Sequence, residues 1–248
     1  MSGFVIHILL CAHLSPEEYG SFSIALTVIN IVAFFSGFGI DRLWLWIFSA
    51  EGRSGFRWVP STLNIAYLTA LFNAILVSIL CFLPIFSDNV NRLLLYFLPI
   101  LISQTLIIAV CAIYQLERNY RKLSLYRFIT NGLRLLLVIV IIAIGGDLLF
   151  VGHLFALGSL VICLLCLSPL IRMYKKNVVL QEKTGLYSDN EPKPSIHDTF
   201  KLMWPYATSG FLYLAYSQTG IVLLGILSND EDAGVFNIAY LIVLFIYL

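Results

Sequence analysis

The polar residues of this chain that are best suited to bind a ligand lie within or beside long apolar runs. Arg134 occurs in RFITNGLRLLLVIV, three residues after Asn131, while Asp41 and Arg42 lie between GFGI and LWLWIF. Gln218 interrupts another apolar run near the end of the chain. If these runs cross a bilayer, an ionisable group at its centre costs about 2.5–3.5 kcal/mol on insertion scales and needs a reason. An arginine at such a position could bind an anionic group.

Each of these residues also has a purely structural interpretation. Arg134 lies about seven residues into its run, a depth of roughly 10 Å at the helical rise, so its side chain could reach back to the interface. Asp41 and Arg42 could neutralise each other or anchor the chain at the interface. Amides between transmembrane helices more often form interhelical hydrogen bonds than line a cavity. The amides concerned are Asn64, Asn73, Gln104, Gln115, Asn131 and Gln218. The sequence leaves these alternatives open.

No motif for catalysis or metal binding is present in the sequence. It contains no G-x-x-x-x-G-K-[ST], G-x-S-x-G or H-E-x-x-H pattern, and its four histidines have no ligand spacing. Cys163 and Cys166 form a C-x-x-C in LVICLLCLSP, but no second pair or nearby histidine accompanies them, which favours helix packing. We therefore expect no catalytic residue, no metal and no cofactor, and a protein that is not an enzyme.

The composition is that of a membrane protein. Of 248 residues, 60% are hydrophobic and 12% charged, with a mean hydropathy of +0.91, whereas soluble domains are about 25% charged. Apolar runs of about 20 residues indicate membrane spans. They occur near residues 1–14, 20–48, 59–86, 92–116, 124–144, 148–171, 201–227 and 234–248, the first and last being short. The sequence predicts an all-α polytopic membrane protein with about eight spans.

The basic residues predict the orientation of these spans. Thirteen of the 15 lysines and arginines fall in alternate connectors, whereas the opposite connectors hold only Arg92 and seven of the 14 acids. Because basic residues accumulate in cytoplasmic loops, we predict that the first helix runs outward. The loops at SPEEY, SDNVN, GGD and SNDED then face the outside.

One sequence pattern occurs twice. LSPEEYGSFSIAL at residues 14–26 and LSNDEDAGVFNIAYL at 227–241 share Leu-Ser, an acidic cluster and Gly-x-Phe-x-Ile-Ala, with Gly20 and Gly234 separated by 214 residues. Both copies lead from an outside loop into an inward helix, which predicts a parallel repeat about an axis along the membrane normal. A chance match over a dozen residues is the alternative.

A real repeat would also define the domains. The polar stretch between the sixth and seventh helices reads as a flexible linker. We expect an N-terminal lobe at residues 1–174, a cytoplasmic linker at 175–200 and the start of a second lobe at 201–248. The second unit would need roughly 200 further residues, so we expect the chain to be a fragment cut at both ends.

The two segments that contain the repeated pattern also resemble a known family. The loop at Leu14 to Gly20 and the Gly-hydrophobic-Asp element at Gly39 to Asp41 resemble the second-helix signature of polysaccharide biosynthesis flippases, the Wzx-type O-antigen transporters. KLMWPYATSGFLYLAYSQTGIVLLGILSNDEDAGVFNIAY looks like the seventh and eighth helices of that family, with Pro205 near its start. Relatives often carry a charged residue before the Leu-Leu-Gly element, where this chain has Thr219 and Gly220.

The resemblance implies an architecture and a function. The family belongs to the multidrug/oligosaccharidyl-lipid/polysaccharide (MOP) flippase superfamily, which implies two MATE-like six-helix lobes and alternating access. The implied substrate is a polyprenyl-pyrophosphate-linked oligosaccharide moved across the bacterial inner membrane. The implied partners are this lipid-linked glycan, the lipid bilayer and other polysaccharide assembly proteins, with no nucleic acid.

Within this hypothesis the residues discussed first take roles in substrate binding. Arg134 is the best candidate for attracting the phosphates, followed by Arg42, with Asp41, Asn131 and Gln218 completing the set. The alternatives are an ion-coupled exporter of the same superfamily, a polytopic glycan polymerase or acyltransferase, and an inactive fragment.

Overall fold

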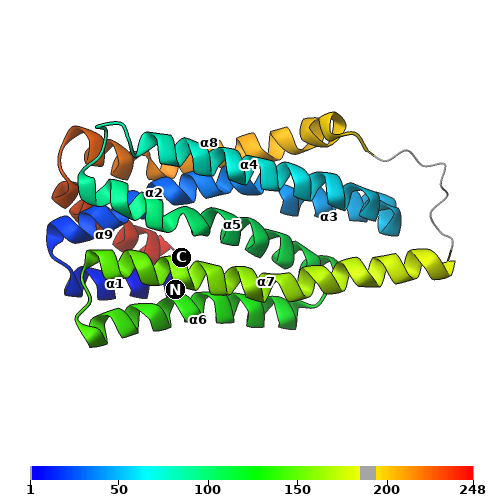
Figure 1. The fold of residues 1–248 in the computed structure, drawn as a ribbon, viewed down its shortest axis with the longest axis horizontal. Coiled ribbons are helices and arrows are strands. Elements are labelled where there is room, and N and C mark those ends of the chain that lie inside the picture. Colours follow the sequence, from blue (N-terminus) through cyan, green and yellow to red (C-terminus); the bar gives the residue numbers. More distant parts are fainter. Residues whose placement is uncertain (1, 185–193, 248) are drawn as a thin grey trace.

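The chain forms one elongated bundle of helices (Figure 1). The structure is a computed structural model that describes residues 2–184 and 194–247. Its helices are α1 (Ser2–His13), α2 (Pro16–Gly37), α3 (Ile40–Glu51), the 3₁₀ helix η1 (Gly52–Trp58), α4 (Val59–Leu80), α5 (Asp88–Leu116), α6 (Tyr120–Ile144), α7 (Leu148–Thr184), α8 (Ile196–Leu227) and α9 (Asp230–Tyr247). No strand occurs in these described ranges. The all-α prediction is confirmed.

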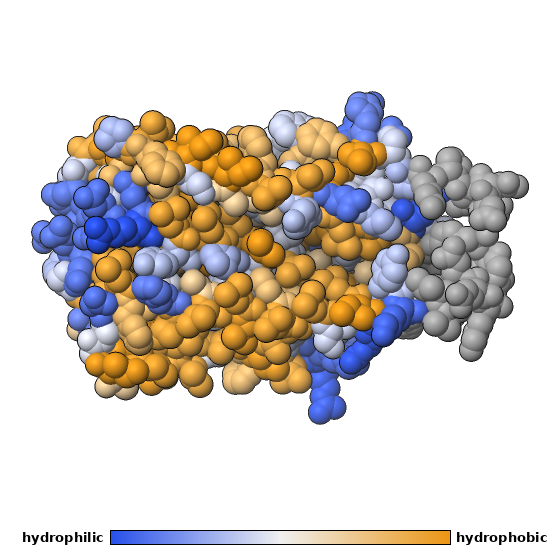
Figure 2. All heavy atoms as spheres, viewed as in Figure 1, coloured by the Kyte–Doolittle hydropathy of each residue, from blue (hydrophilic) through white to orange (hydrophobic). Residues whose placement is uncertain are grey.

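Within the described residues, six helical segments are long and apolar enough to cross a membrane. They are Pro16–Glu51, Ser54–Leu80, Asp88–Leu116, Tyr120–Ile144, Leu148–Lys175 and Ile196–Leu227. Two of the eight predicted spans are not among them, because α1 is short and α9 carries three acids in its first turn. Figure 2 shows an apolar band across the middle of the visible face, with hydrophilic residues toward both ends. The protein is a multi-pass membrane protein.

The connectors fall at the two ends of the bundle as the charge pattern predicted. The acidic connectors α1–α2, α4–α5, α6–α7 and α8–α9 lie together at one end (Figure 1). The connectors α3–α4 and α5–α6 lie at the other end, together with the last residues of α7 and the first residues of α8. We call these ends the acidic end and the basic end. Assigning the basic end to the cytoplasm remains a prediction from the distribution of basic residues.

One predicted helix is broken. The run at 20–48 was expected to be continuous, but α2 ends at Gly37 and α3 begins at Ile40, with Phe38 and Gly39 at positive φ of 44° and 72°. The reason is local packing. A Cβ on Gly39 would lie 2.7 Å from the Tyr206 Cβ of α8, so only glycine fits. The buried Phe38 ring stacks on Phe200 of the same helix.

Helix extends into both ends of the expected linker. Helix α7 continues to Thr184 and α8 begins at Ile196, so helix occupies part of the segment 175–200 that was expected to be flexible. Residues 185–193 lie outside the described residues. The division into two lobes stays a prediction.

The core forms around α2, which packs against α4, α5, α8 and α9. At its centre the rings of Phe22, Phe97 and Phe155, from α2, α5 and α7, make edge and tilted contacts at centroid distances of 5.5–5.9 Å. Asn73 of α4 donates hydrogen bonds to the Val32 carbonyl and to Ser36 Oγ of α2, at 3.3 and 3.0 Å. This amide confirms the interhelical interpretation.

The two copies of the repeated sequence face each other. Ser15 caps α2 by accepting from the Glu18 N–H at 3.3 Å, and Asn229 caps the turn of α9 by accepting from the Asp232 N–H at 2.7 Å. The offset of 214 residues relates Ser15 to Asn229 and Glu18 to Asp232, so the two caps are equivalent. Asn237 donates to Ser23 Oγ at 3.0 Å, and this pair has the same offset.

The glycines of the repeat lie at the contact itself. A Cβ on Gly20 would overlap the carbonyl of Asp230, and one on Gly234 would lie 2.9 Å from the Gly20 Cα and 3.3 Å from the Pro16 carbonyl oxygen. Pro16 and Asp230 are again equivalent positions, so exchanging the copies exchanges the two contacts. Helices α2 and α9 therefore meet across a local two-fold axis, as in an isologous interface.

A buried carboxylate completes this contact at the acidic end. Asp230 Oδ2 accepts hydrogen bonds from Ser21 Oγ of α2 at 2.5 Å and from Ser87 Oγ, the N-cap of α5, at 2.6 Å. Asp230 is 8% exposed. Three helices are thus joined at one charged group, which closes the acidic end of the bundle between α2, α5 and α9.

This contact makes a prediction about the glycine. Gly20→Ala should lower the stability of the protein in detergent by about 1–3 kcal/mol, the usual cost of overpacking, because its methyl group displaces α9. Gly132→Ala is the matched control, since a Cβ there meets nothing within 4 Å and alanine favours a helix by up to about 1 kcal/mol. Thermal unfolding of the two variants measures the difference. Equal stability of both would contradict the close approach of α2 and α9.

Candidate functional site

Helices α5 and α6 each present a polar stripe. On α6, Arg127, Asn131 and Arg134 are spaced by four and three residues and so share one face of the helix. On α5, Gln104 and Gln115 are eleven residues apart, close to three turns, and also share a face. The two stripes line the same space.

The position of α6 keeps this space open. Helix α6 packs mainly against α1 and α7, and less closely against α5. The Asn119 side chain caps its first turn by accepting from the Lys122 N–H at 3.2 Å. Tyr126 Oη lies 2.6 Å from Cys166 Sγ of α7, which fixes the second turn of α6 to its neighbour. Packing on α1 and α7 thus holds the arginine stripe opposite α5 without closing the gap.

The gap is a cavity of about 260 Å³. It is lined by Asp41 of α3, by Gln104, Ile107, Ile108, Cys111, Ala112 and Gln115 of α5, and by Arg127, Thr130, Asn131 and Arg134 of α6. Two cations, one carboxylate and three amides therefore converge from three helices. Such a mixture suits a ligand that carries both negative charge and hydroxyl groups.

Arg134 has a buried group without a partner. Its Nη2 atom is shielded from solvent and forms no hydrogen bond with any described residue. The described part of the chain also places no carboxylate within ion-pair distance of Arg134, although Asp41 lines the same cavity. Burying a cation without a counter-charge is costly, so this guanidinium is suited to receive an anion.

The structure brings three of the five predicted site residues together and separates the other two. Asp41, Asn131 and Arg134 line the cavity. Arg42 instead donates from Nη1 to Ser209 Oγ of α8 at 3.3 Å, and Gln218 lies further along α8, outside the cavity lining.

Sequence reasoning did not connect Gln104, Gln115 and Arg127 with this site. The available signal was their helical spacing, since polar residues three, four and eleven apart recur on one helix face. That signal shows a shared face but not which helix the face opposes.

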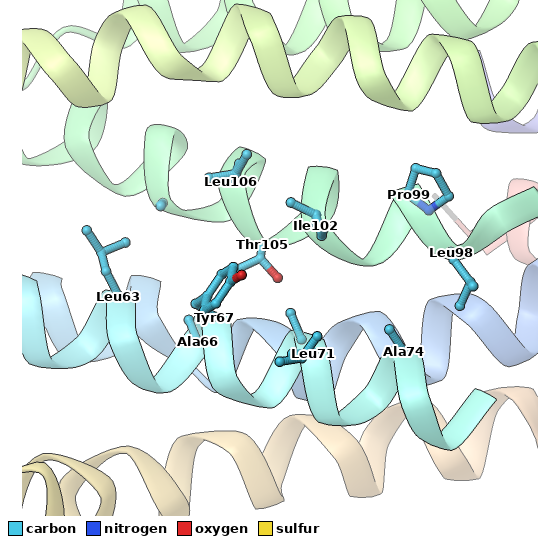
Figure 3. Close-up of a pocket in the computed structure, with 12 residues that line it drawn as sticks. Leu63, Ala66, Tyr67, Leu71, Ala74, Leu98, Pro99, Ile102, Thr105 and Leu106 are labelled. Atoms are coloured by element: carbon cyan, nitrogen blue, oxygen red, sulfur yellow. The ribbon is translucent and has the colours of Figure 1, made fainter. Parts of the chain in front are cut away.

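A second cavity lies on another side of α5 and has a different character. It measures about 310 Å³ between α4 and α5, and its lining includes Ala66, Ala70, Leu71, Pro99 and Ile102. Figure 3 shows Ala66, Leu71 and Ile102 in the space between the two helices, with side-chain hydroxyl oxygens from Thr105 and Tyr67. No charged residue lines it. It offers no cation to an anionic ligand.

The unpaired arginine makes a prediction about stability. Arg134→Met keeps the length of the side chain and removes the buried charge, so it should stabilise the ligand-free protein by about 2 kcal/mol on membrane-insertion scales. Thermal unfolding in detergent measures this change. Arg127→Met is the matched control and should change stability little, because Arg127 is exposed. A destabilised Arg134→Met protein would mean that the guanidinium stabilises the fold.

The comparison with known families agrees with these features. The family described as "Polysaccharide biosynthesis protein" matches residues 1–247. No curated protein and no solved structure matches this chain significantly. The match covers nearly the whole chain, including the repeated segments and the helices that line the polar cavity. This membrane-spanning chain therefore belongs to the polysaccharide biosynthesis protein family.

Proposed function

We propose that the protein is a Wzx-type flippase, which moves a polyprenyl-diphosphate-linked oligosaccharide across the bacterial inner membrane by alternating access. The observation that carries this proposal is the buried, unpartnered Nη2 of Arg134 in a polar cavity within the apolar band. A lipid-linked glycan must bring its phosphates through the hydrocarbon layer. A preformed cationic cavity offsets the loss of their hydration.

The arrangement of the two arginines suits a diphosphate. Arg127 and Arg134 are seven residues apart, which places them two turns, or roughly 10 Å, apart along α6. Both side chains line one cavity, and a guanidinium can bind phosphate oxygens through two parallel N–H groups. A ligand entering between them gains two charge-assisted contacts from one rigid helix.

The two ends of the bundle support a cytoplasm-facing state. The acidic end is closed by the contact of Gly20 with Gly234 and by the Asp230 hydrogen bonds. Arg127 lies nearer the basic end, where α6 begins, than Arg134 does. With the basic end in the cytoplasm, the substrate would enter from the side where precursors are made and leave when α2 and α9 separate.

The role of Arg134 can be tested by transport. Arg134→Ala should reduce glycan export in cells at least tenfold, the loss expected for one charge-assisted hydrogen bond in a buried site. Arg134→Lys should retain part of the activity, since it keeps the charge but loses the forked geometry. Arg92→Ala, at the acidic end, is the control and should export normally. Normal export by Arg134→Ala would exclude this arginine as the phosphate ligand.

Separation of α2 and α9 can be tested by cross-linking. Asn237 Nδ2 lies 3.0 Å from Ser23 Oγ, and nearly one turn away a Cβ on Gly234 would lie 2.9 Å from the Gly20 Cα, so we expect cysteines at positions 23 and 237 to form a disulfide. In a background without the five native cysteines, oxidation of Ser23→Cys/Asn237→Cys should arrest export, and a reductant should restore it. Each single cysteine variant serves as the control. Continued export by the cross-linked protein would show that this contact does not open.

A further inference from the structure

The polar cavity contains more acceptor groups than an anion site needs. Asp41 lines it together with Arg127 and Arg134, yet no ion pair of Asp41 occurs among the described residues. A free carboxylate repels a diphosphate and weakens its binding. Its presence in the same cavity therefore calls for a second part of the ligand, one that donates hydrogen bonds.

Gln104 and Gln115 also have hydrogen-bonding groups without partners among the described residues. Both are half-buried on the α5 face of the cavity, and neither side chain hydrogen-bonds to a residue in the described part of the chain. By contrast, the amide of Asn73 is satisfied by α2. Each glutamine has two N–H donors and a carbonyl acceptor, and Asp41 offers only acceptors. Together they match a neutral ligand whose groups both donate and accept, as sugar hydroxyls do.

The size of the cavity limits how much of such a ligand it holds. At about 260 Å³ it is smaller than the pockets of about 300–1,000 Å³ that enclose drug-sized ligands. It therefore accommodates a small part of a glycan chain, with the rest extending outside. The part that must lie closest to Arg134 is the sugar attached to the phosphates.

We infer that Asp41, Gln104 and Gln115 form a sugar subsite, which binds the hydroxyl groups of the sugar ring joined directly to the diphosphate. The inference rests on the proposed function and adds to it a division of the cavity. Helix α6 binds charge through its arginines, while α3 and α5 bind hydroxyls. The first sugar then contributes to the choice of substrate, whereas the diphosphate contact is common to all precursors linked through a diphosphate.

A structural role for Asp41 is the competing explanation. Asp41 lies in the first turn of α3, where a carboxylate stabilises a helix through its dipole. This role would make Asp41 important for stability but not for the identity of the ligand. The two explanations differ in whether replacing Asp41 changes the affinity for two ligands unequally.

Measuring the binding of two lipids distinguishes the two explanations for Asp41. The full chain in detergent is titrated with polyprenyl diphosphate and with the same lipid carrying one sugar. Asp41→Asn keeps the size of the side chain and should weaken binding of the glycosylated lipid about tenfold, as for one hydrogen bond to a charged group. It should leave binding of the sugar-free lipid unchanged or tighter, since a repulsive charge is lost. Gln104→Leu should show the same selective loss.

Control variants show which proposal each possible result supports or contradicts. Asp88→Asn makes the same change at the acidic end and should bind both lipids normally, whereas Arg134→Ala should weaken both. If Asp41→Asn weakened both lipids equally, or neither, the sugar subsite would be wrong and the proposed function would stand. If the unsubstituted protein bound neither lipid, both proposals would fail. Thermal unfolding of each variant shows whether a loss of binding follows from a loss of folding.

Discussion

A polar group in the hydrocarbon layer of a membrane must find its partner inside the protein, because no water is present there to replace one. The described structure meets this constraint at most of its polar positions. Asn73 pairs with Ser36 and the α2 backbone, and Asn237 pairs with Ser23. Arg134 departs from this pattern, since its Nη2 is buried without a partner. A group that the fold leaves unsatisfied is available to a ligand.

Close helix packing is the second consequence of the same environment. Without a hydrophobic driving force between helices, association depends on contact area, which small residues increase. Gly20 and Gly234 bring the backbones of α2 and α9 together, and Gly39 does the same for the start of α3 and α8. The contact of Gly20 with Gly234 closes the acidic end of the bundle, and the contact of Gly39 with Tyr206 holds α8 against the start of α3. The polar cavity remains where α6 is held on α1 and α7 instead of on α5.

Much of the fold was predictable because membrane helices can be recognised in a sequence from their length, their hydropathy and the charges that flank them. The apolar runs, the grouping of connectors at two ends and the correspondence of the caps at Ser15 and Asn229 all follow from local sequence. The break at Phe38 and Gly39 was missed, because glycine and phenylalanine are both common within membrane helices. What enforces the break is Tyr206 of α8, a residue far away in the sequence.

The sequence by itself determined the membrane class, the alternation of charged connectors, the repeat and the unusual position of Arg134. These depend on composition and on spacing along the chain, which any helix must preserve. Only the tertiary structure decided that Arg134 lines a cavity with Asp41 and Asn131, and that Arg42 contacts Ser209 instead. The physical reason is that a helix fixes which residues share a face, whereas packing against other helices decides what that face meets.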